Sequence, residues 1–148
     1  MKKFAIILTI VAATAMIFSS CGKYEEGPAF SLLTKKARIT GTWTLSEMTI
    51  DGEVQDLAGM TTTTVLEKDG TGSMTASFGG FSFSADIEWE FDDTKENLRT
   101  RTYDADSEEW SDWSETKITK LTNSECWMED SETVGEVTVV TVTKMTKE

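Results

Sequence analysis

The segment Ile39-Thr40-Gly41-Thr42-Trp43-Thr44-Leu45 marks the point at which the character of the chain changes. An apolar leader and a polar stretch precede it, and short runs of alternating apolar and polar residues follow it. Alternation with a period of two is typical of β-strands, because successive side chains of a strand point to opposite faces. We therefore expect a β domain that spans residues 39–148.

The clearest strand is predicted for residues 81–91. Serines and three carboxylates fill every second position, and apolar side chains fill the positions between them. The apolar set is Phe81, Phe83, Ala85, Ile87, Trp89 and Phe91. A one-residue slip would turn the carboxylates toward the core, so the register of this strand is strongly specified. We expect the apolar set to face inward together.

Seven further strands are predicted, at residues 40–50, 61–68, 72–78, 98–103, 110–119, 125–129 and 136–146. Turn dipeptides such as Asp51-Gly52, Asp69-Gly70 and Gly79-Gly80 separate several of them. The connections are short enough for antiparallel neighbours, and no long helical pattern is available for a parallel crossover. The predicted fold class is all-β: an eight-stranded antiparallel up-and-down barrel, with a two-sheet β-sandwich as the alternative.

Residues 1–20 have the pattern of a secretory signal. Lys2 and Lys3 precede fifteen uncharged residues, a run shorter than the roughly 20 that a transmembrane helix needs. Small residues then lead to Cys21, an arrangement that resembles the lipobox of bacterial lipoproteins, in which the cysteine is diacylated and becomes the new N-terminus. The resemblance implies lipidation at Cys21 and an outer-membrane location. The alternative is an ordinary cleaved signal with an unrelated cysteine.

Residues 21–38 are predicted to form a lipidated tether that ends in a short helical turn. The first part is polar, contains the only proline of the chain and is expected to be flexible. Ser31 is a suitable N-cap for the turn, which ends in basic residues. Glu25-Glu26 resembles the surface-export signal of some Gram-negative lipoproteins, and a solvated linker is the alternative. Both the periplasmic side and the cell surface therefore stay open.

The charge argues against a nucleic-acid partner. The formal net charge of −12 becomes −14 when Lys2 and Lys3 are removed with the leader. Phosphate binding needs a basic surface, which this chain lacks. An acidic surface also repels anionic headgroups, so we expect any contact with the membrane to be made by the lipid on Cys21. With Cys21 lipidated, Cys126 has no partner for an intrachain disulfide, and we expect it to be a small buried side chain.

The sequence carries no catalytic motif. The chain contains no histidine, which excludes Ser-His-Asp and Cys-His catalysis and removes the commonest zinc ligand. Residues 104–115 place carboxylates as a calcium loop does, with Glu115 at the twelfth position, but Glu109 occupies the sixth position, where the loop needs glycine. We therefore expect no enzyme activity, no cofactor and no metal site.

Gly41-Thr42-Trp43, on the first strand of an eight-stranded meander, resembles the Gly-x-Trp signature of lipocalins. With the lipobox and the tether, the chain is similar over residues 36–146 to small lipocalin-like lipoproteins of Gram-negative bacteria. The resemblance implies that Trp43 closes the narrow end of the barrel under a basic residue of the last strand. Lys144 is the candidate for that residue.

The implied function is the binding of a small apolar ligand inside the barrel. The predicted ligand-binding residues are Phe81, Phe83, Ile87, Trp89 and Phe91. The alternative is a surface-exposed interaction or adhesin-type module with a filled barrel, since inward aromatic residues of small β domains often form plain core. An internal cavity would favour ligand binding, and a filled interior would favour interaction.

Overall fold

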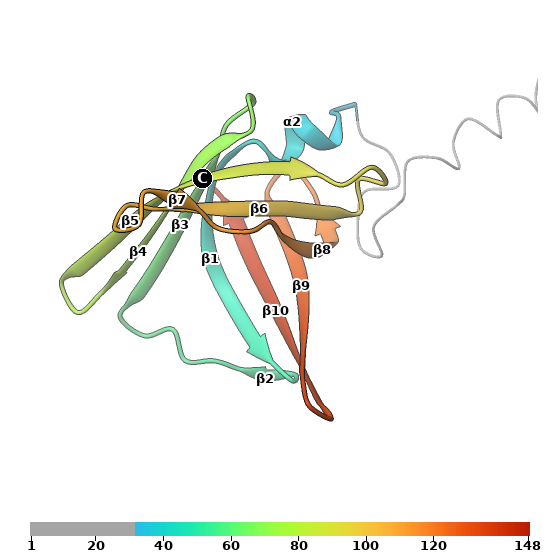
Figure 1. Cartoon of the computed structure of the whole chain (residues 1–148). Coiled ribbons are helices and arrows are strands. Elements are labelled where there is room, and N and C mark those ends of the chain that lie inside the picture. Colours follow the sequence, from blue (N-terminus) through green and yellow to red (C-terminus); the bar gives the residue numbers. More distant parts are fainter. Residues whose placement is uncertain (1–31) are drawn as a thin grey trace, which may run out of the picture.

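The computed structural model describes residues 32–148, so the leader, Cys21 and Ser31 lie outside the described part of the chain. Within that part, eight long strands form a closed antiparallel barrel (Figure 1). They are β1 (Gly41–Ile50), β3 (Met60–Leu66), β4 (Thr71–Phe78), β5 (Phe81–Phe91), β6 (Asn97–Asp104), β8 (Ser114–Leu121), β9 (Glu125–Val134) and β10 (Val137–Lys147).

Each barrel strand pairs with the next along the chain, and β10 pairs with β1 to close the barrel. Two short strands extend this arrangement: β2 (Glu53–Val54) pairs with the end of β1, and β7 (Glu109–Trp110) pairs with the end of β6. The predicted up-and-down barrel is therefore confirmed, and the alternative of a two-sheet sandwich is wrong. Because β1 and β10, the first and last barrel strands, pair with each other, the barrel has no free edge strand at its closure within the described residues.

The extent of two strands differs from the prediction. The strand expected at 110–119 is divided, because Trp110 belongs to β7 and β8 begins only at Ser114. β9 continues to Val134 instead of ending at residue 129. Its polar second half pairs residue by residue with β10 in one long hairpin, and this pairing overrides the turn-like composition of the segment.

One end of the barrel lies beneath α2 (Lys35–Ile39), and we call it the closed end (Figure 1). Thr34 caps the helix, because its hydroxyl accepts a hydrogen bond from the backbone N–H of Ala37 at 3.1 Å. The N-cap predicted from the sequence, Ser31, lies outside the described residues. The last residue of α2, Ile39, is fully buried in the barrel.

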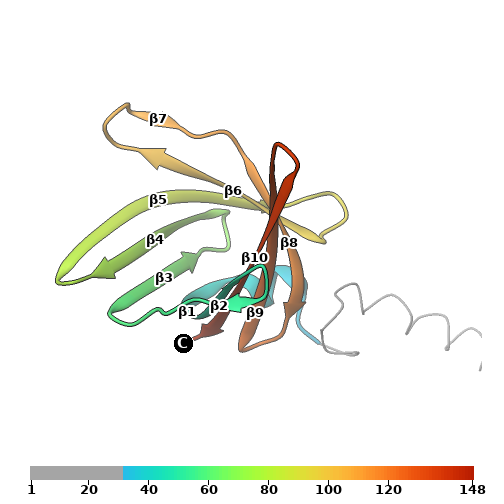
Figure 2. The same cartoon turned by 90° about the horizontal axis from the view of Figure 1, so that it is seen from below.

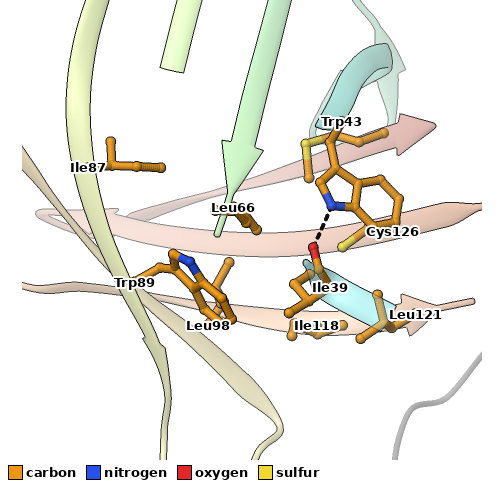
Figure 3. Packing of buried hydrophobic residues seen from close by; sticks show 10 residues of the cluster. Ile39, Trp43, Leu66, Ile87, Trp89, Leu98, Ile118, Leu121 and Cys126 are labelled. Atoms are coloured by element: carbon orange, nitrogen blue, oxygen red, sulfur yellow. Dashed lines mark hydrogen bonds between the residues drawn. The ribbon is translucent and has the colours of Figure 1, made fainter. Parts of the chain in front are cut away.

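The hydrophobic core fills the closed end (Figure 3). Its buried members are Ile39, Trp43, Leu66, Ile87, Trp89, Leu98, Ile118, Leu121, Cys126 and Met145. The two buried indole N–H groups are satisfied by backbone carbonyls: Trp43 donates to Ile39 at 2.6 Å, and Trp89 donates to Glu67 and Thr71 at 3.0 Å. The Cys126 side chain is fully buried, so the predicted small buried cysteine is confirmed, and this burial raises the pKa of its thiol to about 12.

At the opposite end the hairpins diverge (Figure 2). β5 pairs with β4 from Phe81 to Glu88 but with β6 only from Ile87 to Phe91. The hairpins β4–β5, β6–β7 and β9–β10 therefore separate toward their tips. We call this part the open end and define it as residues 49–62, 76–86, 103–114 and 130–141.

Candidate ligand-binding site

The signature residues Gly41 and Trp43 lie at the closed end, where the resemblance placed them. Gly41 has a φ of 137°, and a Cβ added there would lie 2.4 Å from Cε of Lys147. Only glycine combines this backbone conformation with room for the lysine chain. The Trp43 side chain is 0% exposed, so the predicted burial of this tryptophan at one barrel end is confirmed.

The basic residue beside Trp43 is Lys147, and the prediction of Lys144 is wrong. Lys147 pairs in register with Trp43, its Nζ lies 5.2 Å from the centroid of the indole, and it donates a hydrogen bond to the carbonyl of Arg38 at 2.9 Å. Partial burial lowers the pKa of Lys147. An odd number of positions separates the two lysines, so Lys144 points outward.

Lys144 contributes instead to an outer cluster around Trp127. Its Nζ lies 4.4 Å from the indole centroid, and Nζ of Lys120 lies 4.1 Å from the same centroid. Each lysine also pairs with a carboxylate, Lys144 with Glu47 at 2.7 Å and Lys120 with Glu125 at 3.1 Å. The contacts tie β1, β8, β9 and β10 together from outside.

Arg38 is a buried cation within α2. Its Nη1 donates to the carbonyl of Leu121 at 2.8 Å, while its Nε has no hydrogen-bond partner among the described residues. The guanidinium thereby joins the helix to the end of β8. Together α2, its Arg38 side chain and Lys147 cover this end of the barrel.

The barrel interior keeps a cavity of about 170 Å³ on the open-end side of the core. Its wall combines aliphatic side chains, thioethers and hydroxyls from six strands. The lining residues are Thr64, Leu66, Met74, Ile87, Leu98, Thr100, Thr102, Met128 and Met145. The described walls of this cavity carry no charged group, which suits an apolar ligand with one or two polar atoms.

The predicted ligand-binding residues divide into three groups. Ile87 lines the cavity, as the strand pattern predicted. Trp89 is buried in the core below it, and Phe91 packs edge-on against Trp89, with ring centroids 5.9 Å apart. Phe81 and Phe83 are 84% and 65% exposed, so the prediction that the whole apolar face of residues 81–91 is dry is wrong at these two positions.

The exposure of Phe81 and Phe83 has a topological cause. Both lie in the part of β5 that does not pair with β6, so the neighbouring strand that would help to cover their rings is missing there. They instead line a shallow apolar groove of about 310 Å³ at the tip of the β4–β5 hairpin. The groove also includes Met60, Ala76 and Phe78.

The cavity residues from β3, β4, β6, β9 and β10 were not among the predicted site residues. Thr64, Thr100 and Thr102 lie on strands whose alternation is threonine-rich, and hydroxyls do not mark an inner face by hydropathy. The register supplies the missing signal, because Thr100 and Thr102 pair with Trp89 and Ile87 and therefore share their face.

A larger groove of about 500 Å³ includes residues of the outer face of β5. Trp113, Glu88 and Glu90 contribute to its lining. Both glutamates are neutralised by arginines, Glu90 by Arg99 at 2.5 Å and Glu88 by Arg101. The guanidiniums stack within 5.3 Å of Trp113, so this surface is internally paired.

The segment that resembles a calcium loop does not form one. Asp104 stands at the open end of β6, whereas Glu115 pairs with Arg99 nearer the closed end and accepts a hydrogen bond from the side chain of Asn97 at 2.7 Å. Across residues 32–148, no group of three or more acidic or cysteine side chains is placed to hold a metal ion.

Comparison of the chain with models of known protein families and with curated proteins gives no match. The assignment to a class therefore rests on the fold: the protein is an eight-stranded antiparallel barrel with one capped end and one open end. In the described part of the chain, no helix has the length and apolar character needed to cross a membrane.

Proposed function

We propose that the protein is a lipid-anchored, lipocalin-like protein of the bacterial outer membrane that binds a small apolar ligand in its barrel. The observation that carries the proposal is the uncharged internal cavity of about 170 Å³ between a sealed end and an open one. The resemblance of Gly41-Thr42-Trp43 to the lipocalin signature, and of the Cys21 region to a lipobox, supports the same reading.

The size of the cavity narrows the ligand class. Typical sites for drug-sized ligands measure about 300–1,000 Å³, whereas an apolar cavity of roughly 150 Å³ accepts a single benzene. The internal space therefore suits one ring or a short acyl segment. The apolar groove near Phe81 continues along the inner face of β4 and β5, because Ala76 follows Met74 there at the next inward position. A longer apolar chain would extend from the cavity into this groove.

A second candidate is an interaction module, and the small volume of the cavity favours it. Most of the closed half is filled by the core, while exposed aromatic side chains stand at the open end. In this reading the cavity is a packing imperfection and the open end is the functional surface. The cavity residue Ile87 is distinct from the exposed aromatic side chains of the open end, so variants at the two places separate the two functions.

Ligand binding is tested with the soluble chain that begins at Lys23. Apolar probes of increasing length, from benzene to medium-chain fatty acids, should quench tryptophan emission saturably. Ile87→Trp replaces a branched alkyl side chain of the cavity wall by a larger indole ring, and it should weaken binding by about tenfold or more because the indole occupies part of the ligand's space. Glu88→Ala, the outward neighbour, loses only a surface ion pair and should bind normally. Equal binding by wild type and Ile87→Trp would place the probes elsewhere.

Native mass spectrometry of the protein from its own source tests the ligand and the anchor together. A co-purifying apolar compound would support the carrier, and a mass increment of a diacylglyceryl group at Cys21 would support the anchor. Cys21→Ser should shift the protein from the detergent-extracted membrane fraction to the soluble fraction. Native protein without lipid on Cys21 would contradict the anchoring proposal.

A further inference from the structure

The open end exposes many large apolar side chains. Eight large apolar side chains are exposed there, namely Ile50, Val54, Phe78, Phe81, Phe83, Trp110, Val134 and Val137. Single exposed apolar residues are common, but a contiguous group marks a contact surface. Phe78, Phe81 and Phe83 form such a contiguous group, because all three line the same groove.

Beside this groove, β5 presents an incompletely paired edge. The backbone of residues 81–86 pairs with β4 on one side, while the ladder with β6 begins only at Ile87. A sheet edge of this kind is a template on which an extended segment of another chain can add as a strand. A cleft of about 430 Å³ lies along this edge, between β5 and the β6–β7 hairpin.

The cleft joins an aromatic surface to three carboxylates. Phe83 and Tyr103 contribute rings, and Asp86, Asp104 and Asp106 contribute the acids. Hydrogen bonds from the backbone N–H of Asp106, with further ones from Ser107, hold the pKa of Asp104 below its usual range, so its carboxylate is charged at neutral pH. Phe83 lines both the cleft and the apolar groove, which makes the two one continuous surface.

The charge of the whole described chain is concentrated at this end. The four open-end segments contain twelve acidic residues and no lysine or arginine. The rest of residues 32–148 contains twelve acidic and eleven basic residues. The open end therefore carries a formal charge of −12 and the remainder −1. An apolar surface within such a field attracts a partner that is both apolar and cationic.

We propose that the cleft between β5 and the β6–β7 hairpin binds an extended segment of a partner protein in which apolar and basic residues alternate. Added along the edge of β5, such a segment places its apolar side chains beside Phe81 and Phe83. Its basic side chains lie on the opposite face, the side of Asp86. A second copy of this chain is disfavoured, because two open ends that meet bring like charges together.

The extent of the charge favours a polypeptide over a small cation. The acidic residues are distributed over four separate segments, and a molecule confined to the cleft reaches only the carboxylates of Asp86, Asp104 and Asp106. A segment with several basic side chains interacts with neighbouring hairpins at the same time. This inference concerns the unpaired edge of β5 and the cleft beside it, and it does not depend on whether the cavity beneath holds a ligand.

The test uses the full chain in nanodiscs of zwitterionic lipid, with empty nanodiscs as the blank. The probe is a fluorescent peptide of alternating valine and lysine, and its binding is followed by anisotropy. The cleft variant Asp86→Asn/Asp104→Asn/Asp106→Asn should weaken binding by about tenfold or more, because three charge contacts are lost. The matched variant Glu67→Gln/Asp93→Asn/Glu96→Gln removes the same charge at the closed end and should change binding by less than about twofold.

Further comparisons identify the contacts. Phe83→Ser should weaken binding, whereas Val137→Ser, which alters an equally exposed side chain on another hairpin, should not; the two residues are 65% and 64% exposed. A peptide of alternating valine and glutamate should not bind, and raising the salt to about 1 M should weaken the lysine peptide, since the Debye length falls to roughly 3 Å. Ile87→Trp should leave peptide binding intact, which separates this proposal from ligand binding in the cavity.

Several outcomes would overturn the proposal. Equal affinity of the peptide for wild type and for the cleft variant would show that the three cleft carboxylates do not contact it. An equal loss of affinity in the closed-end variant would show that only the net charge of the protein matters. Binding of the peptide of alternating valine and glutamate would show that the open end does not select basic over acidic segments. Dimers in light scattering that disappear in Phe83→Ser would assign the cleft to a second copy of the chain.

Discussion

The two ends of this barrel are built from the same strands but differ in the burial of their apolar side chains and in the pairing of their charges. At the closed end, α2, Trp43 and Lys147 cover a core whose buried polar groups are mostly satisfied. At the open end, phenylalanines and unbalanced carboxylates face solvent. The first end has the features that give stability and the second has the features of recognition. A single strand, β5, therefore contributes to a packed core at one end and to exposed apolar surface at the other.

Substitution of the aromatic residues should show the largest contrast between the ends. Trp43→Ala should cost about 3–5 kcal/mol of unfolding free energy, because a fully buried indole and its hydrogen bond are lost. Phe81→Ala at the open end should cost less than about 0.5 kcal/mol. Urea unfolding of both variants measures the contrast. A cost below about 1 kcal/mol for Trp43→Ala would show that the closed end is not the stabilising half.

Glycine substitutions should give the next largest contrast. At Gly72 a Cβ would lie 2.1 Å from the carbonyl oxygen of Val65, so Gly72→Ala must move β3 from β4 and should cost about 2–3 kcal/mol. At Gly135 nothing lies within 4 Å, and only its φ of 67° opposes a side chain. Gly135→Ala should therefore cost about 1 kcal/mol. Similar unfolding midpoints for the two variants would contradict this packing difference.

The two lysines of β10 provide a finer test of which one supports Trp43. Lys147→Ala removes a partly buried hydrogen bond and a cation–π contact, and should cost about 1–2 kcal/mol. Lys144→Ala removes a surface ion pair and a contact with Trp127, and should cost about 0.5 kcal/mol. Thermal unfolding of both variants ranks them. The reverse order would restore Lys144 as the supporting residue.

The smallest expected effect is the acid dependence of a closed-end turn. Burial of Asp92 opposes ionisation, but hydrogen bonds from Thr94 and from the backbone N–H groups of Asn97 and Glu96 outweigh it and lower the pKa of Asp92 below 3.8. A carboxyl whose pKa is lower in the folded state stabilises the fold above its unfolded pKa, and this contribution is lost as pH falls through the folded value. Asp92→Asn should therefore flatten the decline of stability below pH 3.8. An unchanged profile would show that other carboxyls control acid unfolding.

The fold was predictable from the sequence because its signals are local. Alternation along residues 81–91 indicated which side chains of that strand share a face, and dipeptides such as Asp69-Gly70 indicated where the hairpins turn. The second half of β9 was missed because its residues are polar and extended only through pairing with β10. The site was partly predictable: Ile87 follows from alternation, whereas Thr100 and Thr102 enter the cavity through register with β5.

The all-β class, the burial of Trp43 and the strong acidity follow from the amino-acid sequence alone, since periodicity, a signature motif and a charge count need no knowledge of the neighbouring strands. Only the tertiary structure decided that Phe81 and Phe83 are exposed, because their burial depends on whether β6 stays beside β5. It also decided that Lys147 and not Lys144 contacts Trp43, since the face of a residue depends on the register of its strand. The segregation of charge has the same origin: acidic segments far apart in the chain meet at one end only because the strands run up and down.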